Sequence, residues 1–310
     1  MPTTTDLRTA PPRKAYIVTG PTAGIGRLAA LELAGHGTVV LVGRDRAKLD
    51  ETQKLIARKG GQAVPVVCDL SDIVGARRAA ADVVALDLPI AGLLNNAGIR
   101  QQHPTKSAQG WDLSFATNHL GPFVLTEALL PHLADGTNIL FVASAVEDPN
   151  RKLAARAGFR GGRYISAEAS ARGEWKPGGS ARPGFDSYAT TKQCTLAAAL
   201  ELARENPRLH INAVEPGLTP GTSLGREAKG AAGLVAHYIL PLMVPFVRAM
   251  STPRRAARLL AKILRDASGR TGIYYDQDGG PMPGSELIRD PRFTSRVVAE
   301  TRALLATVPA

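Results

Sequence analysis

The segment TGPTAGIG, residues 19–26, gives the clearest indication of how this 310-residue chain folds. It follows a short β-branched run at residues 15–19 and precedes an apolar-periodic helix expected over about residues 25–34. Glycines at such a junction permit a tight turn, and the backbone N–H groups of a helix N-terminus bind phosphate. The alternative is a glycine-rich turn that only packs the helix on the strand. Because the segment joins a strand to a helix, we favour a pyrophosphate site. Its expected residues are Gly20, Thr22, Gly24, Ile25 and Gly26.

The rest of the chain continues this order of strand and helix. Short apolar strands that alternate with longer helices indicate βαβ units and a parallel sheet covered on both faces. We therefore predict an α/β fold, a single-domain Rossmann doubly wound parallel sheet of about seven strands. The expected strands are at about residues 15–19, 38–42, 63–68, 90–94, 139–143, 210–214 and 273–275. The expected helices are at about residues 25–34, 47–59, 73–86, 115–133, 187–205 and 254–265.

Three segments stand outside this pattern. Residues 1–13 are polar and contain proline, so we expect a flexible tail and no signal peptide, with one domain over residues 14–310. Residues 147–186 are rich in Arg, Gly, Ser and Pro and are expected to form an inserted loop. The apolar stretch at residues 234–250 contains two prolines and is too short for a clean bilayer span. We expect it to line a substrate pocket within residues 218–252; contact with a membrane surface is the alternative.

The composition and net charge of the chain bear on which ligands and partners it could bind. The chain is 44% hydrophobic and 21% charged, as is typical of soluble globular proteins. Its net charge is +11 and its pI about 10.0, but the basic residues are scattered and no basic run is interleaved with aromatics. We therefore expect no nucleic-acid binding; basicity also suits a polyanionic cofactor. Cys68 and Cys194 have no metal or disulfide spacing, and we expect no metal site and a cytoplasmic protein.

The end of the second expected strand bears on the choice of cofactor. NAD sites usually place a carboxylate there for the ribose 2′-hydroxyl, whereas a 2′-phosphate favours an arginine. Gly43 occupies this position and Arg44 follows it. The planar guanidinium of Arg44 suits a phosphate. Asp45 leaves NAD(H) open, because it could bind the hydroxyl or pair with Arg44. We predict that NADP(H) is preferred.

The segment YATTK, residues 188–192, is a candidate acid–base site. Tyr188 and Lys192 are four residues apart and therefore lie on one face of the expected helix. A free tyrosine has a pKa near 10, and a neighbouring cation favours the phenolate. A half-buried ring beside a solvated charge is the alternative. The motifs elsewhere in the chain favour the catalytic interpretation.

Further motifs complete a family pattern. The segments are NNAG at residues 95–98, Asp69-Leu70, TNHLG at residues 117–121, Ser144 after the fifth strand, and Pro216-Gly217 after the sixth. With the glycine loop and the Tyr–Lys pair, the chain resembles the short-chain dehydrogenase/reductase family over about residues 14–275. The resemblance implies catalytic roles for Asn118, Ser144, Tyr188 and Lys192. It also implies cofactor contacts by Asp69, Leu70, Asn96, Ala97, Gly98, Tyr188, Lys192, Pro216 and Gly217.

A narrower resemblance concerns one branch of that family. Residues 117–126, 216–224 and 272–275 are similar to the retinol dehydrogenase and protochlorophyllide reductase-like branch. This implies NADP(H) and a bulky lipophilic carbonyl or ring system as substrate. Ser144 and Tyr188 are further apart than the family usually shows. The inserted loop between them is expected to cover the cofactor, shape the pocket or bind a partner.

The resemblance implies a function and a mechanism. We expect NADPH-linked reduction of a carbonyl on a bulky apolar small molecule, or the reverse alcohol oxidation. Tyr188 would donate the proton, Ser144 would orient the substrate oxygen, and Lys192 would lower the tyrosine pKa and hold the nicotinamide ribose. Asn118 would anchor a water leading to solvent. A catalytically silent nucleotide-binding scaffold is the alternative. Homo-oligomers are expected by analogy alone, and stable membrane insertion is not expected.

Overall fold

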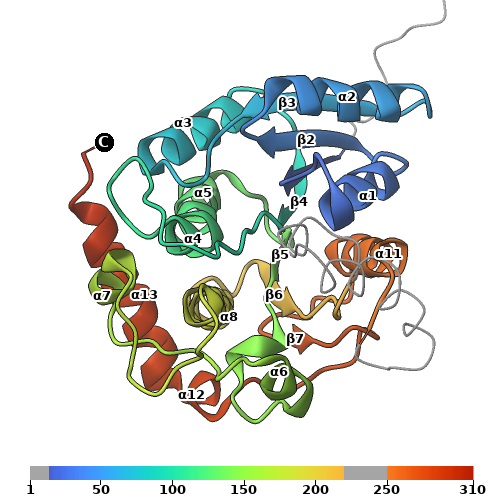
Figure 1. The fold of residues 1–310 in the computed structure, drawn as a ribbon. Coiled ribbons are helices and arrows are strands. Elements are labelled where there is room, and N and C mark those ends of the chain that lie inside the picture. The colour runs from blue at the N-terminus through green and yellow to red at the C-terminus, as the bar shows by residue number, and fades with distance from the viewer. Residues whose placement is uncertain (1–13, 220–249, 310) are drawn as a thin grey trace, which may run out of the picture.

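The computed structural model describes residues 14–219 and 250–309, which build one twisted parallel sheet between helical layers (Figure 1). The strand order is β3-β2-β1-β4-β5-β6-β7, and every neighbouring pair is parallel. This confirms the predicted seven-stranded doubly wound sheet. The strands are β1 (Ala15–Thr19), β2 (Thr38–Gly43), β3 (Gln62–Val67), β4 (Ile90–Asn95), β5 (Asn138–Val142), β6 (His210–Val214) and β7 (Tyr274–Tyr275).

Helices cover both faces because successive strand residues point to opposite sides of the sheet. On β1, Ile17 joins one apolar cluster and Val18 joins the other. One face carries α1 (Gly24–Leu33), α2 (Arg46–Ala57) and α11 (Pro253–Leu264) (Figure 1). The other carries α3 (Ile73–Val84), α4 (Leu113–Phe115), α5 (Gly121–Leu129) and α8 (Phe185–Glu205), with α13 (Pro291–Ala306) packed against α8.

The strand order creates a switch point at the centre of the sheet. β1 lies between β2 and β4, so the chain leaves β1 toward one edge and returns at β4 to build toward the other. The loops after β1 and β4 therefore diverge, and in open α/β sheets ligands bind at the carboxyl ends of the strands at this point. The TGPTAGIG and NNAG segments are these two loops.

One expected helix is interrupted. In place of a continuous helix over residues 115–133, the chain forms α4, a π-helical turn (Ala116–Leu120), α5 and a 3-10 turn (Leu130–His132). The wider turn carries Asn118, and such π-helical turns occur frequently at functional sites. Helical periodicity alone does not reveal one extra residue in a turn.

Two regions contain helices that the sequence analysis did not predict. The inserted segment forms α6 (Lys152–Ala157) and α7 (Ala167–Arg172), each ended by a glycine in the left-handed conformation. The C-terminal region forms α12 (Glu286–Arg289) and α13. The signals for α13 are the N-cap Asp290, Pro291 in the first turn and an apolar stripe facing α8. The buried side chains of α13 are Phe293, Thr294, Val297, Val298, Thr301 and Leu305.

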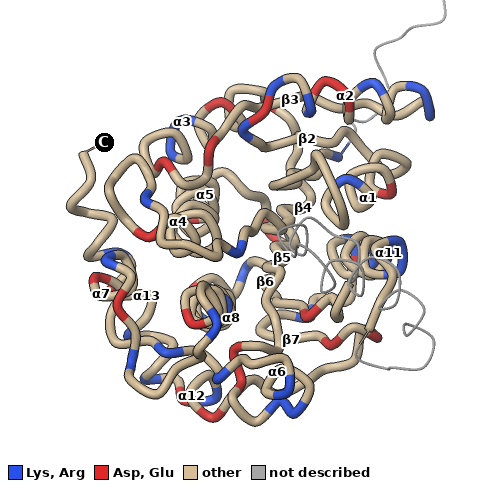
Figure 2. Tube along the Cα trace, in the orientation of Figure 1, with Lys and Arg blue, Asp and Glu red and all other residues tan. Residues whose placement is uncertain are grey.

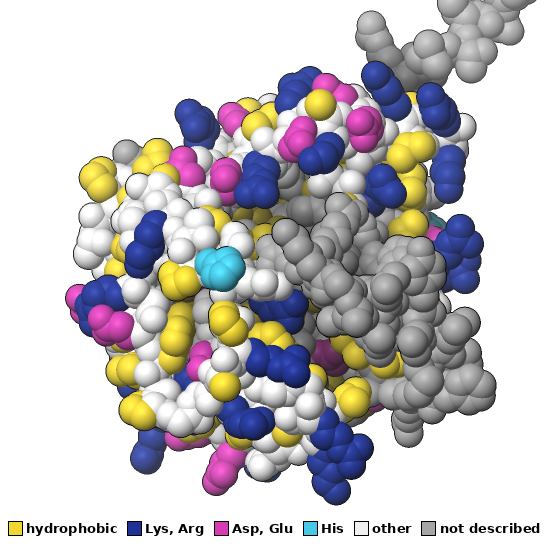
Figure 3. Space-filling view, in the orientation of Figure 1, with side chains coloured by type: hydrophobic (Ala, Val, Ile, Leu, Met, Phe, Trp, Pro, Cys, Tyr) yellow, Lys and Arg dark blue, Asp and Glu magenta, His cyan; other side chains and the backbone are white. Residues whose placement is uncertain are grey.

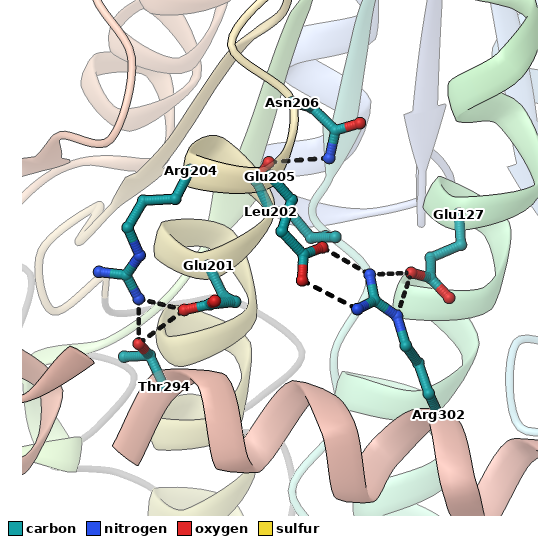
Figure 4. A network of polar contacts seen from close by, with 8 residues as sticks. All are labelled: Glu127, Glu201, Leu202, Arg204, Glu205, Asn206, Thr294 and Arg302. Atoms are coloured by element: carbon teal, nitrogen blue, oxygen red, sulfur yellow. Dashed lines mark hydrogen bonds and ion pairs between the residues drawn. The ribbon is translucent and has the colours of Figure 1, made fainter. Parts of the chain in front are cut away.

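Polar side chains fix α13 to the helices beneath it (Figure 4). The Arg302 guanidinium forms ion pairs with Glu127 of α5 at 2.7 Å and with Glu205 of α8 at 2.6 Å. Near the start of α13, the Thr294 hydroxyl donates to Glu201 of α8 at 3.0 Å. The C-terminal helix is therefore joined to the helix that carries the Tyr–Lys pair.

The proposed pocket segment lies mostly outside the described residues, as does the tail at residues 1–13. Its two flanks are described and lie side by side: Leu218 pairs with Met250, and Ser251 N donates to the Leu218 carbonyl at 3.0 Å. Among residues 14–219 and 250–309, no helix combines the length and apolar character needed to cross a bilayer.

Charges are spread along most elements of the described chain (Figure 2). On the face shown in Figure 3, basic side chains alternate with acidic, apolar and other groups and do not merge into one surface. Within the described part of the chain, no cluster of three or more His, Cys, Asp or Glu side chains is arranged to hold a metal ion.

Candidate active site

The glycine loop forms a narrow backbone cradle at the start of α1. Gly20 has a φ of +66° and Gly24 a φ of +54°, conformations that side chains disfavour. A Cβ at Gly26 would lie 2.3 Å from the Gly20 carbonyl oxygen, so only glycine fits there. Ala23, the N-cap residue of α1, provides no side-chain cap, and Thr22 and Ile25 are half-buried beside it. The first N–H groups of α1 therefore suit an anion.

The loops after β1 and β4 are joined through two side chains. The Thr19 hydroxyl accepts from the backbone N–H groups of Asn96 and Ala97, both at 3.0 Å, and donates to Leu94 O at 3.3 Å. The Asn96 amide donates to the Thr19 carbonyl at 3.0 Å. Asn96 thus holds the two loops together, and Ala97 packs against Gly20.

Arg44 and Asp45 have separate positions beyond β2. Arg44 is exposed. Asp45 is the N-cap of α2: its carboxylate accepts from Lys48 N at 3.2 Å and pairs with the Lys48 ammonium at 2.9 Å. Hydrogen bonds from Lys48 lower the pKa of Asp45. Asp45 is therefore engaged with its own helix, and it does not pair with Arg44.

Asp69, which follows β3, forms hydrogen bonds within its own turn. Asp69 accepts from the Ser71 backbone N–H at 2.9 Å and from the Ser71 hydroxyl at 2.8 Å, and Leu70 beside it is buried. Both residues lie at the carboxyl end of a strand adjacent to β2, on the same edge as the glycine loop. Their expected contact with adenine remains a prediction.

Tyr188 and Lys192 lie on one face of α8, as the spacing predicts. The Lys192 ammonium is buried, lies 5.7 Å from the Tyr188 ring centroid and donates to the Val142 carbonyl at 2.7 Å. Tyr188 is half-buried, and its ring is 6.3 Å from that of Phe159 in the inserted segment. The end of β5 therefore anchors the lysine beside the tyrosine.

The surroundings of Tyr188 differ from the simple expectation for a Tyr–Lys pair. Burial raises the pKa of Tyr188, and the nearby Glu215 carboxylate raises it further, whereas Arg100 lowers it. Burial lowers the pKa of Lys192 to about 8. In the described site the phenol is thus held in its neutral form. We expected Lys192 to lower the pKa of Tyr188, but in the described site burial and Glu215 raise it.

Asn118 connects α8 to the NNAG loop. Its side chain accepts from Ile99 N and donates to Ile99 O, both at 2.8 Å, and donates to the Thr191 hydroxyl at 3.1 Å. A Cβ placed on Gly98 would lie 3.5 Å from Asn118 Oδ1 and 3.7 Å from Lys192 Nζ. Asn118, Gly98 and Lys192 are therefore neighbours, and the water expected at Asn118 remains a prediction.

Ser144 meets a residue that the sequence analysis did not include. Its half-buried side chain accepts from Val146 N at 3.5 Å, and the Glu215 carboxylate binds the backbone of the next residue, accepting from Ala145 N. Glu215 also accepts from Gly217 N at 3.1 Å. The signal that could have found Glu215 is its position, since it directly precedes Pro216-Gly217 where β6 ends. Pro216 and Gly217 are buried there.

His119 lies against the aromatic rings of Phe115 and Phe123. It is buried in the π-helical turn, its Nε2 lies 2.9 Å from the Thr301 hydroxyl, and burial lowers its pKa to about 3. These surroundings indicate a packing role for His119.

Comparisons with known proteins agree with the motifs and the sheet. The family described as short chain dehydrogenase matches residues 14–155. A short-chain dehydrogenase/reductase of Armillaria gallica is 31% identical over 221 residues, covering 67% of this chain and 65% of the relative. The chain thus spans slightly less than two thirds of that relative. Mouse retinol dehydrogenase 14 is 28% identical over 295 residues, covering 84% of this chain and 77% of that protein.

Solved structures share the architecture. A Shigella flexneri protein assigned to the short chain dehydrogenases, solved in complex with NADP, is 27% identical with a TM-score of 0.61. The alignment covers 86% of this chain and 97% of that one. The similarity to retinol dehydrogenase 14 agrees with the narrower resemblance found in the sequence. The chain belongs to the short-chain dehydrogenase/reductase family.

Proposed function

We propose that this protein is an NADP(H)-dependent oxidoreductase that interconverts a carbonyl and an alcohol on a bulky apolar small molecule. One observation carries the proposal. Tyr188 and the buried Lys192 share a face of α8. The Lys192 ammonium donates to the Val142 carbonyl at the end of β5 at 2.7 Å, and it lies beside Asn118 and Gly98. The pair therefore has a defined place relative to the cofactor loops.

The described residues fit a dinucleotide phosphate. The cradle at Gly20, Gly24 and Gly26 and the uncapped N-terminus of α1 would bind the pyrophosphate. Arg44 is exposed, and the Asp45 carboxylate beside it is engaged by Lys48, which favours a 2′-phosphate over a free hydroxyl. NADP(H), when bound, supplies the hydride chemistry. The Shigella relative solved with NADP supports the same choice.

The chain's own residues would position the substrate and move the proton. Because burial raises the pKa of Tyr188, its phenol is protonated at neutral pH and suits a proton donor to a developing alkoxide. Ser144 would hydrogen-bond the substrate oxygen. Lys192 would hold the nicotinamide ribose and place positive charge near the reacting oxygen. Asn118 keeps the NNAG loop against α8 and, by family resemblance, would anchor a water.

An apolar substrate suits the surroundings of Tyr188 in the inserted segment. Phe159 and Phe185 are stacked with ring centroids 4.1 Å apart, and Phe159 also lies beside Tyr188. We propose that these rings form part of the substrate wall, together with the segment at residues 218–252. The match to retinol dehydrogenase 14, whose name refers to a lipophilic alcohol, supports this class of substrate.

The proposal is tested with Tyr188→Phe. A screen of ketones, quinones and retinoids, followed by NADPH absorbance, identifies a substrate for the wild type. We expect Tyr188→Phe to lower kcat by roughly 10²–10⁴-fold, because it removes the proton donor. NADPH binding, measured by fluorescence titration, should weaken far less than kcat falls, because phenylalanine keeps the ring and removes only the hydroxyl. Tyr16→Phe is the matched control, since Tyr16 is buried in the apolar cluster on the face that carries α1 and α11.

Two outcomes contradict the proposal. If the wild type binds NADPH but reduces nothing in the panel, and Tyr188→Phe retains the biological effect of the wild type, the protein is a nucleotide-binding scaffold. If the control Tyr16→Phe loses as much activity as Tyr188→Phe, the phenol at residue 188 has no special role.

We further propose a cytoplasmic protein, consistent with Cys68 and Cys194, which are free and buried.

A further inference from the structure

Two arginines converge on the ring of Phe185 at the start of α8. Arg100, two residues after the NNAG segment, has its guanidinium carbon 5.1 Å from the centroid of that ring. Arg182, in the inserted segment, has its guanidinium carbon 5.6 Å from the same centroid. Phe185 is buried and stacked on Phe159, which lies beside Tyr188. Positive charge therefore gathers at the rings that we propose as part of the substrate wall.

Backbone contacts fix the place of Arg100. The Asn118 side chain binds both backbone groups of Ile99, N and O, at 2.8 Å, so the residue before Arg100 is held to the π-helical turn. Gly184 has a φ of +74°, and a Cβ there would lie 1.7 Å from the Gln101 carbonyl oxygen. The loop after the NNAG segment and the inserted segment are therefore packed backbone to backbone close to both arginines.

Arg182 is held by a turn of the inserted segment and is exposed. The Ser180 hydroxyl accepts from Arg182 N at 3.1 Å and donates to the Gly158 carbonyl at 2.7 Å. A Cβ on Gly158 would lie 3.1 Å from Arg182 Cδ and Nε, so the arginine stem lies along the end of α6. The nearby Asp186 carboxylate accepts from Ser180 N with its two oxygens, at 2.9 and 3.0 Å. In the part of the chain that the structure describes, no acidic side chain forms an ion pair with Arg182.

This arrangement suits an anion. A guanidinium that lies over an aromatic ring keeps N–H donors at its edge, and a pair of these donors matches the two oxygens of a carboxylate. Two cations held at one ring repel each other, and an anion beside both offsets that repulsion. Around Tyr188, Glu215 raises the pKa of the phenol whereas Arg100 lowers it, so charges of opposite sign lie near the phenol. An anionic group would therefore lie on the side of Arg100 and away from Glu215.

We propose that Arg100 and Arg182 bind a carboxylate of the substrate, so that the substrate is an apolar molecule with one acidic group and not a neutral lipid. This rests on the proposed function. The reacting carbonyl or alcohol would lie at Tyr188, the apolar body would pack on Phe159 and Phe185, and the carboxylate would lie at the two guanidiniums. The carboxylate stays ionised throughout and takes no part in hydride or proton transfer.

The kinetic test uses matched ketones. Aryl ketones with a carboxylate at the end of alkyl chains of graded length are compared with their methyl esters by NADPH absorbance. We expect the wild type to have the higher kcat/KM for the acid, mainly through a lower KM, because the carboxylate is remote from the reacting carbon. Arg182→Gln should lower the acid-to-ester ratio about two- to fivefold, since Arg182 is exposed. Arg100→Gln, at a half-buried position, should lower the ratio by roughly tenfold or more.

Two further variants sharpen this test. Arg182→Lys should retain part of the preference for the acid, because it keeps the charge but loses the paired N–H donors. Arg58→Gln is the matched control, since Arg58 is an exposed arginine at the C-cap of α2, and it should keep the wild-type ratio. If the wild type does not prefer the acid, or if Arg182→Gln and Arg100→Gln both leave the ratio as it is, the arginines only pack on Phe185 and the proposal is wrong.

A binding test needs no turnover. Decanoate and decanamide are titrated calorimetrically into the NADPH-bound protein. We expect the wild type and Arg58→Gln to bind decanoate more tightly than decanamide, and the double variant Arg100→Gln/Arg182→Gln to lose this preference. If the wild type reduces no ketone in the panel, the proposed function fails, and this titration alone decides whether the anion site exists. Equal affinity for the two probes, or binding of neither, would then overturn the site as well.

Discussion

Individual side chains at the carboxyl edge of the sheet are fixed before any ligand arrives. The Thr19 hydroxyl and the Asn118 amide each bind backbone groups of the NNAG loop, and Lys192 binds the end of β5. Such hydrogen bonds hold loops in one geometry, which lowers the cost of ordering them when a cofactor binds. Arg44 differs, because it is exposed. We therefore expect Arg44 to act by binding the cofactor phosphate and not by holding a loop in place.

The cofactor preference is tested at this residue. We expect Arg44→Ala to raise the apparent KM for NADPH by roughly 10–100-fold, since one charge-assisted hydrogen bond contributes about 1.5–3 kcal/mol. The KM for NADH should change little. Arg46→Ala is the matched control, because Arg46 is a nearby exposed arginine that pairs with Asp50 at 2.9 Å. Equal effects of Arg44→Ala on both cofactors would show that Arg44 does not bind the 2′-phosphate.

Among the elements, α1 has a tightly packed first turn at Gly26. It lies against both the Gly20 carbonyl and the Asn96 amide, which would approach a Cβ at residue 26 to 2.3 and 2.4 Å. These neighbours are a backbone atom and a side chain that is itself hydrogen-bonded to β1. A substitution there must therefore separate the two cofactor loops.

Gly26→Ala tests this packing. We expect cofactor affinity to fall by at least about tenfold, because contacts this close force a backbone shift costing on the order of 1–3 kcal/mol. Gly35→Ala is the control, since its added Cβ would meet nothing closer than 3.6 Å. Isothermal titration with NADPH measures both variants. Wild-type affinity in Gly26→Ala would mean that the loop does not form the binding cradle.

The sequence predicted the elements whose signals are local. The apolar runs of β1 and β6 were placed with their observed bounds, and five of the six expected helices were placed to within two residues. The π-helical turn at Asn118 was not predicted, since it depends on packing against α8 and the NNAG loop. Glu215 was missed because its position beside Ser144 and Ala145 follows from the pairing of β5 with β6, a contact between segments far apart in the chain. The apolar residues that line one side of α13 are present in the sequence, but they lie C-terminal to residues 14–275, over which the family motifs guided the prediction.

Across the whole molecule, the C-terminal helix completes one face. α13 covers α8 and reaches α5 through Arg302, whose guanidinium binds Glu127 and Glu205 together (Figure 4). The Arg302 side chain is 41% exposed, so solvent weakens this network. Its contribution is correspondingly modest, although it joins three helices.

Arg302→Ala measures that contribution. We expect the free energy of unfolding to fall by about 1–2 kcal/mol in a urea titration, because two carboxylates lose a shared partner. The loss should shrink in high salt, which screens exposed charges. Arg292→Ala, at an exposed position in the first turn of the same helix, serves as the control. Equal stability of the two variants would show that the network adds nothing beyond apolar packing.

The bridge between Leu218 and Met250 has a consequence for how such enzymes diversify. The chain leaves the sheet and comes back to it at adjacent points, one just after Gly217 and the other just before α11. Insertions, deletions or wholesale exchange between these points need not alter the spacing of strands and helices elsewhere. A graft from a relative with a different substrate can therefore be joined at two neighbouring positions, leaving Ser144, Tyr188 and Lys192 where they stand.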